Sequence, residues 1–206
     1  MIYDITPPIT PKLAVWPGDT GLTRESLCDM ARGDNLTLST LRATVHLGAH
    51  ADAPNHYGKV APAIHERSLD YYFGSCQVIR VDVKPASRIT SNAWTNKLSA
   101  PRVLFATGTY PDPEKWNSDF AAFSVELIDF LHDHGVITAG IDTPSIDLFD
   151  SKDLQAHRAM LRHDMAILEG LVLKDVPEGS YELIALPLPL AGFDASPVRA
   201  ILRSIT

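Results

Sequence analysis

Five short segments rich in β-branched or aromatic residues constrain the fold of this chain more than any other feature of its sequence. They lie at residues 41–46, 77–83, 102–107, 136–141 and 181–186, and each is closed by Gly, Pro or Asp, as β-strands commonly are. They do not alternate strictly with helical segments. The pattern therefore predicts an α/β fold with a mixed sheet, curled in part toward a barrel and flanked by helices, rather than a plain doubly wound parallel sheet.

Three helices are predicted between and after these strands. The first spans residues 124–134, because Ser124 is a candidate N-cap, apolar residues recur on one face, and Gly135 suits the position that follows a helix. The second begins near Ser151. The third follows the Ser-Pro pair at 196–197, since proline fits the first turn of a helix.

The composition is that of a single globular domain spanning residues 1–206. Hydrophobic residues make up 45% and charged residues 21%, which is ordinary for a folded domain, and no repeat or linker divides the chain. The net charge of −7 and the lack of a basic run argue against nucleic-acid binding. No apolar run approaches the ~18 residues that cross a bilayer. Two distant cysteines without a C-x-x-C motif suit a reducing compartment, so we expect a cytoplasmic protein.

The segment from residue 44 to residue 56 contains the densest group of metal-binding side chains. His46, His50, Asp52 and His56 stand within eleven residues. A glycine and a proline inside the segment favour an ordered loop for the last three, with His46 at the end of the preceding strand. On such a loop the four side chains can converge on one point.

This ligand set is typical of a catalytic metal centre. Catalytic zinc sites use nitrogen and oxygen ligands and keep one position open for water, whereas structural sites more often use cysteine. Asp52 has two oxygens and could bridge two metals. The alternative is that these are unrelated polar loop residues, since single histidines are usually surface or satisfied core groups, but the density of the cluster favours the metal.

Two residues far along the chain are further candidate ligands. Glu169 lies in an apolar run at 166–173, where a carboxylate is rarely buried unless it is paired or bound to a cation. His157 lies in the second predicted helix. A helix continuing from His157 to Glu169 would separate them by ~18 Å, so the helix must end near His163 if both serve one centre. From these residues alone, His157 could equally be an exposed histidine of a helix, and Glu169 could equally be a carboxylate at a strand end that accepts from nearby amides.

The sequence resembles the cyclase-like metal-dependent hydrolases, whose signature is His-x-Gly-Thr-His-x-Asp-x-Pro-x-His. Residues 46–56 read HLGAHADAPNH, so Ala49 replaces the commoner threonine and no ligand is lost. Within that family the chain is similar to the bacterial kynurenine formamidases across nearly its whole length. The similarity is carried by WPGD at 16–19, HADAP at 50–54, GIDTPS at 140–145, ILEGL at 167–171, YELIALP at 181–187 and DASPVR at 194–199.

The resemblance implies a swivelling β/β/α-type fold, a homodimer, and a centre of two zinc ions that hydrolyses the small molecule N-formyl-L-kynurenine to L-kynurenine and formate. It implies the following roles: His46, His50 and Asp52 hold the first metal; Asp52, His157 and Glu169 hold the second; His56 acts as acid and base off the metals; and Trp16 contacts the substrate. Manganese or cobalt could replace zinc at such ligands.

Several alternatives stay open at this point. Trp16 could be only an anchor for the turn before Pro17, and Asp142 and Ser145 could line the pocket or cap a turn. Asp194 and Ser196 are interpreted as helix caps. The substrate could be another aryl amide or a cyclic amide such as isatin, and an inert metal-binding protein is the rival from another class.

Overall fold

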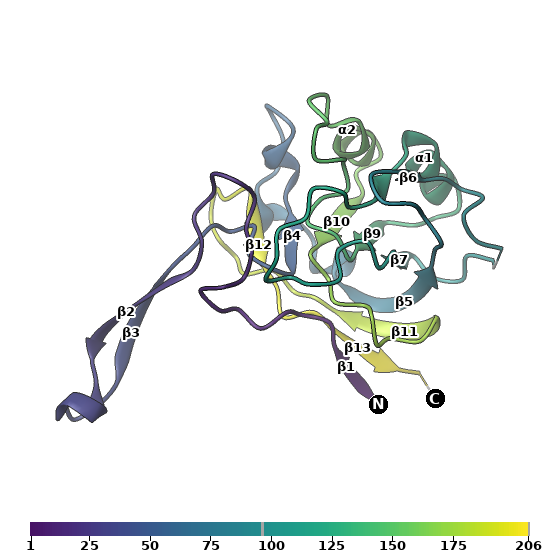
Figure 1. Cartoon of the computed structure of the whole chain (residues 1–206). Helices are drawn as coiled ribbons and strands as arrows, with labels where there is room; N and C mark the ends of the chain where they lie inside the picture. Colours follow the sequence, from purple (N-terminus) through teal and green to yellow (C-terminus); the bar gives the residue numbers. More distant parts are fainter. Residues whose placement is uncertain (96, 206) are drawn as a thin grey trace.

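A nine-stranded mixed sheet forms the body of the protein in the computed structural model, which describes residues 1–95 and 97–205 (Figure 1). The strand order is β1-β13-β11-β5-β7-β9-β10-β4-β12. The central strands β5, β7, β9 and β10 run parallel, and the outer pairs are antiparallel. The bounds are Ile2–Asp4 (β1), His50–Asp52 (β4), Phe73–Arg80 (β5), Arg102–Ala106 (β7), Thr138–Ile141 (β9), Ala166–Glu169 (β10), Gly179–Ile184 (β11), Ala195–Pro197 (β12) and Ile201–Ser204 (β13).

Two amphipathic helices cover one face of the parallel strands (Figure 1). Helix α1 (Val125–Asp133) buries Leu127, Ile128 and Leu131, and helix α2 (Gln155–Arg162) buries residues including Met160. Burial of each large aliphatic side chain stabilises the fold by roughly 1.5–3 kcal/mol. Among the described residues, no helix is long and apolar enough to cross a lipid bilayer.

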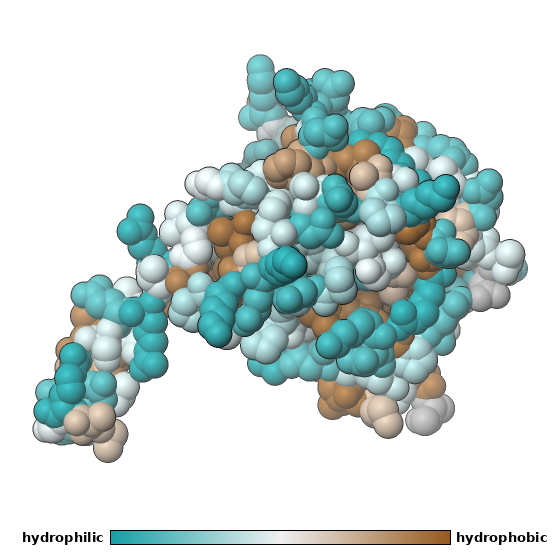
Figure 2. Space-filling view, in the orientation of Figure 1, coloured by the Kyte–Doolittle hydropathy of each residue, from teal (hydrophilic) through white to brown (hydrophobic). Residues whose placement is uncertain are grey.

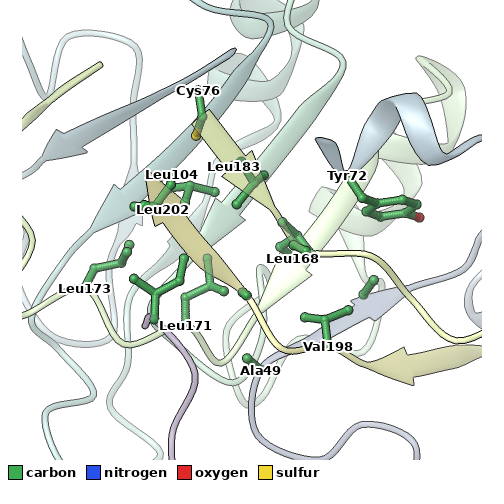
Figure 3. Packing of buried hydrophobic residues seen from close by; sticks show 14 of the residues in the cluster. Ala49, Tyr72, Cys76, Leu104, Leu168, Leu171, Leu173, Leu183, Val198 and Leu202 are labelled. Atoms are coloured by element: carbon green, nitrogen blue, oxygen red, sulfur yellow. The ribbon is translucent and has the colours of Figure 1, made fainter. Parts of the chain in front are cut away.

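The other face of the sheet curls around a second apolar core. Leu202 on β13 and Leu168 on β10 belong to one buried cluster, together with Ala49 and Val198 next to β4 and β12 (Figure 3). These strands lie far apart in the strand order, so their side chains can share a core only because the sheet bends into a half-barrel.

A two-stranded arm projects away from this body (Figure 1). Strands β2 (Thr23–Cys28) and β3 (Leu38–Arg42) pair with each other and with no other strand of the described residues, and a short 3-10 helix, η1 (Met30–Arg32), lies at the tip. Figure 2 shows apolar and hydrophilic side chains side by side on the arm. The remaining short elements are β6 (Arg88–Ile89), β8 (Ala122–Phe123), η2 (Pro54–His56), η3 (Ile64–Glu66) and η4 (Leu69–Tyr71).

The predicted fold class and four of the five predicted strands are confirmed, with ends shifted by a few residues. The prediction of a strand at 41–46 is wrong in position. The chain is extended only to Arg42, within the arm, and it bends before His46. Its apolar residues gave a strand signal, yet Leu41 is exposed and packs against no core in the described structure.

The first predicted helix is confirmed: the Ser124 hydroxyl accepts a hydrogen bond from Leu127 N, and Gly135 has a φ of 80°. The second begins later than predicted, at Gln155, because Asp147 rather than Ser151 accepts hydrogen bonds from its first amides. The prediction of a third helix is wrong. The chain at 195–197 pairs with β4 as edge strand β12, where a proline is tolerated.

Gly170 makes the closest backbone contact beside strand β10. It has a φ of 65°, and a Cβ atom built on it would lie much closer to the Gly48 carbonyl oxygen than van der Waals contact allows. This contact holds the segment that carries His46 and His50 against the end of β10. Any larger residue at position 170 must push these two segments apart.

We expect Gly170→Ala to destabilise the protein much more than Gly192→Ala. Both residues have positive φ, which costs about 1–2 kcal/mol for alanine, but Gly192 has open space around it while Gly170 does not. The additional overpacking should cost about 1–3 kcal/mol. Urea unfolding of both variants in the presence of a chelator measures the difference. Equal unfolding midpoints would show that the Gly48 segment moves away freely.

Candidate metal centre

The pairing of strands β4 and β10 brings the first candidate ligands together. Successive residues of a strand point to opposite faces, so His50 and Asp52 of β4 lie on the same face, while Ala51 points into the apolar core. Glu169, the last residue of β10, pairs directly with His50. All three side chains are at most 3% exposed. His50 and Asp52 were predicted on a loop, and that placement is wrong, because β12 and β10 enclose their segment as a strand.

Helix α2 contributes His157 from above this pair of strands. Its Nε2 lies 3.4 Å from Asp52 Oδ2 and 3.5 Å from Glu169 Oε1. Its Nδ1 lies 2.9 Å from Asp147 Oδ2, so Nδ1–H donates to that carboxylate. The helix ends at Arg162, as predicted, and Asp164 then turns the chain with a φ of 51°. This early end allows Glu169 to return to the centre.

His46 and His56 lie on the pocket side of Asp52. His46 Nδ1 is 3.0 Å from Asp52 Oδ1, and its Nε2 is 3.0 Å from Asp194 Oδ2. His56, in the 3-10 helix η2, has its Nδ1 3.3 Å from the same Asp194 oxygen. One carboxylate therefore orients both imidazoles, and the bend at His46 replaces the strand end that was predicted there.

Three buried atoms of the centre lack hydrogen-bond partners among the described residues, and they test whether a metal fits. His50 Nε2 and both carboxylate oxygens of Asp52 are buried and make no hydrogen bond within the described residues. Each buried polar atom without a partner would destabilise the folded protein by about 1–3 kcal/mol. Yet the side chains face one another at 3.0–3.4 Å, close to the ~3.4 Å between ligand atoms that lie about 2.1 Å from a tetrahedral metal. The residues fit a divalent cation.

Two overlapping ligand sets are present. His46, Asp52 and His56 form one, and His50, Asp52 and Glu169 form the other; in each set the ligand atoms lie within 4.8 Å of one another. Asp52 belongs to both sets, as its predicted bridging role requires. His56, predicted to stay off the metals, is close enough to belong to the first set.

The two buried histidines are fixed with one nitrogen directed at the centre. A carbonyl oxygen can only accept, so His50 Nδ1–H donates to Gly48 O over 2.9 Å, and Asp147 holds His157 in the same way. Each leaves Nε2 for the centre. Such acceptors behind metal-binding histidines orient the ring and increase its basicity.

The electrostatics of the centre follow from burial opposed by close pairing. Burial acts to lower the pKa of His50, but the nearby carboxylates of Asp52 and Glu169 raise it to about 10. Burial acts to raise the pKa of Asp52, but its close pairing with three histidines holds it well below its usual value. A metal ion that binds here must displace histidine protons, so its affinity rises with pH.

A pocket of about 600 Å³ opens onto these residues. Its wall includes Trp16, a residue that is 38% exposed and whose ring centroid lies 5.2 Å from those of both Trp116 and Phe149. Trp16 also accepts a backbone hydrogen bond from Asp19 that closes a turn, so both interpretations of Trp16 agree with its position. Asp142 and Ser145 line the pocket as well.

Two residues of the site escaped the sequence interpretation. Asp147 carried no signal beyond being an acidic residue in a loop. Asp194 was interpreted as a helix cap, and this is wrong because it bonds His46 and His56 instead. The apolar alternation of the residues after Asp194, with Val198, Ala200 and Leu202 buried, is the signal of a strand that could have found it.

Comparisons with known proteins identify the family and the shared fold of this chain. The Cyclase family model, described as "Putative cyclase", matches residues 3–148. The chain is similar to the structure of a potential metal-dependent hydrolase with cyclase activity, with 27% identity over 98% of this chain and 96% of that one and a TM-score of 0.85. A predicted metal-dependent hydrolase from Bacillus stearothermophilus shows 28% identity over 98% and 97%, with a TM-score of 0.82.

A third solved structure shares the fold at lower identity. It is an isatin hydrolase bound to the product analogue thioisatinate, with 19% identity over 98% of this chain and 91% of that one, and a TM-score of 0.83. The curled sheet and its two helices are therefore common to proteins whose sequences have diverged widely.

We expect Asp147→Ala to weaken metal binding about 10- to 100-fold, because His157 loses the acceptor that orients its ring. Competition with a chromophoric chelator measures this affinity. Asp153→Ala is the matched control, since Asp153 is an exposed acidic residue of the same loop. Equal affinities in the two variants would mean that His157 needs no support from Asp147.

Metal content should depend on which ligand is removed. Asp52→Ala should abolish binding in both sets, whereas Glu169→Ala should remove one ion and leave the other, because Glu169 belongs to one set alone among the described residues. Elemental analysis of purified, metal-loaded protein gives the stoichiometry. An Asp52→Ala variant that retained the full metal content would refute the shared-ligand arrangement.

Proposed function

The chain belongs to the Cyclase family, and on that basis we propose that it is a metal-dependent amidohydrolase that converts N-formyl-L-kynurenine to L-kynurenine and formate. The observation that carries the proposal is the orphaned set of buried ligand atoms around Asp52, at the floor of a pocket walled by aromatic rings. The sequence motifs shared with bacterial kynurenine formamidases favour this substrate.

We take the ligand roles from the family resemblance, and the position of Asp52 in both sets supports them. His46, His50 and Asp52 would hold a first zinc ion, and Asp52, His157 and Glu169 a second, with Asp52 between them. Bound zinc supplies a water with a pKa near 7 and polarises the carbonyl to be attacked. The protein contributes the rest: it fixes the histidine rings through Gly48 O and Asp147 and excludes bulk water from the buried carboxylates.

We assign the proton transfer to His56, and its contacts support this role. Its Nδ1–H donates to Asp194, which leaves Nε2 as the base, and its side chain is 35% exposed at the pocket. The attacking water oxygen bonds to the formyl carbon, and His56 accepts a water proton and delivers it to the anilide nitrogen as the C–N bond breaks. Formate and the aryl amine then leave. His56 touches the reacting atoms in this scheme, so it is a catalytic residue.

The aromatic wall suits the aryl group of such a substrate. Trp16, Trp116 and Phe149 present ring faces and edges to one another, and an added aromatic ring in offset contact gains about 0.5–1.5 kcal/mol beyond its buried area. Trp16 and Trp116 both line the pocket, and Trp16 is the more exposed of the two, so we assign it the substrate contact.

The proposed reaction is tested by steady-state turnover of the metal-loaded enzyme. We expect formate release from N-formyl-L-kynurenine with a far higher kcat/KM than ring opening of isatin. Negligible formate release together with rapid isatin hydrolysis would refute the proposed substrate and favour a cyclic amide instead.

His56→Ala should lower kcat by about 100- to 10,000-fold while the protein keeps its metal, because general acid–base catalysis is lost and the other ligands remain. Elemental analysis alongside turnover separates the two roles of His56. Loss of metal in this variant would make His56 a ligand. His132→Ala is the control, since that histidine is exposed on α1, away from the pocket.

We also propose that the protein is a homodimer in the cytoplasm, where its two free cysteines would stay reduced. The arm supports the dimer. An isolated two-stranded ribbon is marginally stable in water, and this one exposes Leu27, Met30, Leu38 and Leu41. A second copy that covers these side chains would stabilise the ribbon.

Sedimentation analysis tests the dimer. We expect twice the 22.5 kDa chain mass for the wild type and a shift toward monomer for Met30→Glu combined with Leu41→Glu. Val60→Glu introduces a charge at an exposed apolar residue of the body and should leave the mass unchanged. A monomeric wild type would refute the dimer.

A further inference from the structure

Three charged side chains line the pocket apart from the metal centre, and two of them are available to a ligand. Most of the remaining wall is apolar, but Asp19 and Lys174 bring one negative and one positive group to it. Asp142 also lines the pocket, but its two oxygens accept hydrogen bonds from Thr107 N, Gly108 N and the Thr107 hydroxyl, so it is occupied within the protein. Asp19 and Lys174 are therefore the charges available to a ligand.

Lys174 is carried by a loop that is held rigidly. The Arg80 guanidinium donates to the carbonyl oxygens of Leu173, Lys174 and Val176 over 2.6–2.9 Å. Val172 N donates to Ile5 O, which fixes the start of the loop. The loop leaves β10 directly after Glu169, so it connects the metal centre to the pocket wall. The Lys174 side chain is exposed and makes no hydrogen bond or ion pair among the described residues.

Asp19 is fixed at the end of the turn that presents Trp16. Asp19 N donates to Trp16 O over 2.9 Å, and Gly18 supplies the positive φ of 95° that the turn needs. One Asp19 oxygen accepts from Thr20 N over 2.6 Å, which leaves the second oxygen for another donor. The carboxylate is thereby held beside the aromatic wall.

We propose that Lys174 and Asp19 form a subsite for the amino-acid tail of the substrate: the Lys174 ammonium pairs with the α-carboxylate and the Asp19 carboxylate with the α-ammonium. The proposal rests on the proposed function and deepens it. In N-formylkynurenine the aromatic ring and a ketone chain separate the formamide from a zwitterion. That arrangement matches a pocket with a metal centre at its floor, aromatic rings in its wall and two opposite charges away from the metal.

The pairs should act on substrate binding and not on the chemical step. Partly exposed ion pairs contribute up to about 1 kcal/mol, equivalent to about fivefold, and a cleft with apolar walls strengthens them. We therefore expect each pair to change KM by about fivefold to tenfold and kcat much less.

Four substrates with one reacting group test the subsite in the metal-loaded enzyme. They are N-formyl-L-kynurenine, its deaminated analogue with the carboxylate alone, its decarboxylated analogue N-formylkynuramine with the ammonium alone, and 2-formamidoacetophenone with neither. Lys174→Met should remove the preference, measured as a ratio of kcat/KM values, for substrates that carry the carboxylate. Asp19→Asn should remove the preference for those that carry the ammonium.

Lys174→Glu gives a sharper result, because it should reverse the preference between the two singly charged analogues. Lys152→Met and Asp153→Asn are matched controls, since both residues are exposed and neither lines the pocket. A wild type that hydrolyses none of the four compounds overturns the proposed function and the subsite together. Hydrolysis of all four with equal kcat/KM, or with preferences that no variant alters, overturns the subsite alone.

Discussion

The antiparallel pairing of β4 with β10 is the constraint on which the rest of the site depends. It sets Glu169 opposite His50 and, through the alternation of side chains along a strand, puts Asp52 on the same face. A slip of one residue would turn every one of these side chains toward the apolar core. The close approach of Gly170 to Gly48 and the pairing of β12 with the other edge of β4 both oppose such a slip.

This register buries charged groups, which is energetically unfavourable, and neighbouring side chains offset part of this cost. Two carboxylates and two imidazoles are buried together, and charges in such a place are tolerated only when they are paired or bound to a cation. Asp147 shows how the remaining groups are satisfied. Its carboxylate accepts from two amides at the start of α2 and from His157, so the same oxygen atoms begin the helix and orient its functional side chain. The pKa of Asp147 falls to about 2, because its pairing with His157 outweighs its burial.

Local chemistry in the sequence predicted much of this centre, and tertiary contacts explain what it missed. The density of ligands at residues 46–56 pointed to a metal, whereas Glu169 in its apolar run became a candidate ligand through the family resemblance. The end of α2 near His163 was predicted because a longer helix would hold His157 and Glu169 too far apart to share one centre. By contrast, DASP at 194–197 looks like a helix start, although its pairing with β4 makes it a strand. The strand at residue 41 belongs to the arm, and no local pattern separates an arm strand from a core strand.

The position of Asp194 has a consequence for the order of folding. Its carboxylate joins His46 and His56 across 148 and 138 residues of sequence, and β12 closes the edge of β4 from the same distant segment. Asp194 is therefore the 138th residue that a ribosome adds after His56. Contacts of such long range form late and slowly in folding. The two pocket-side histidines gain their shared acceptor only after the segment that carries Asp194 has been made.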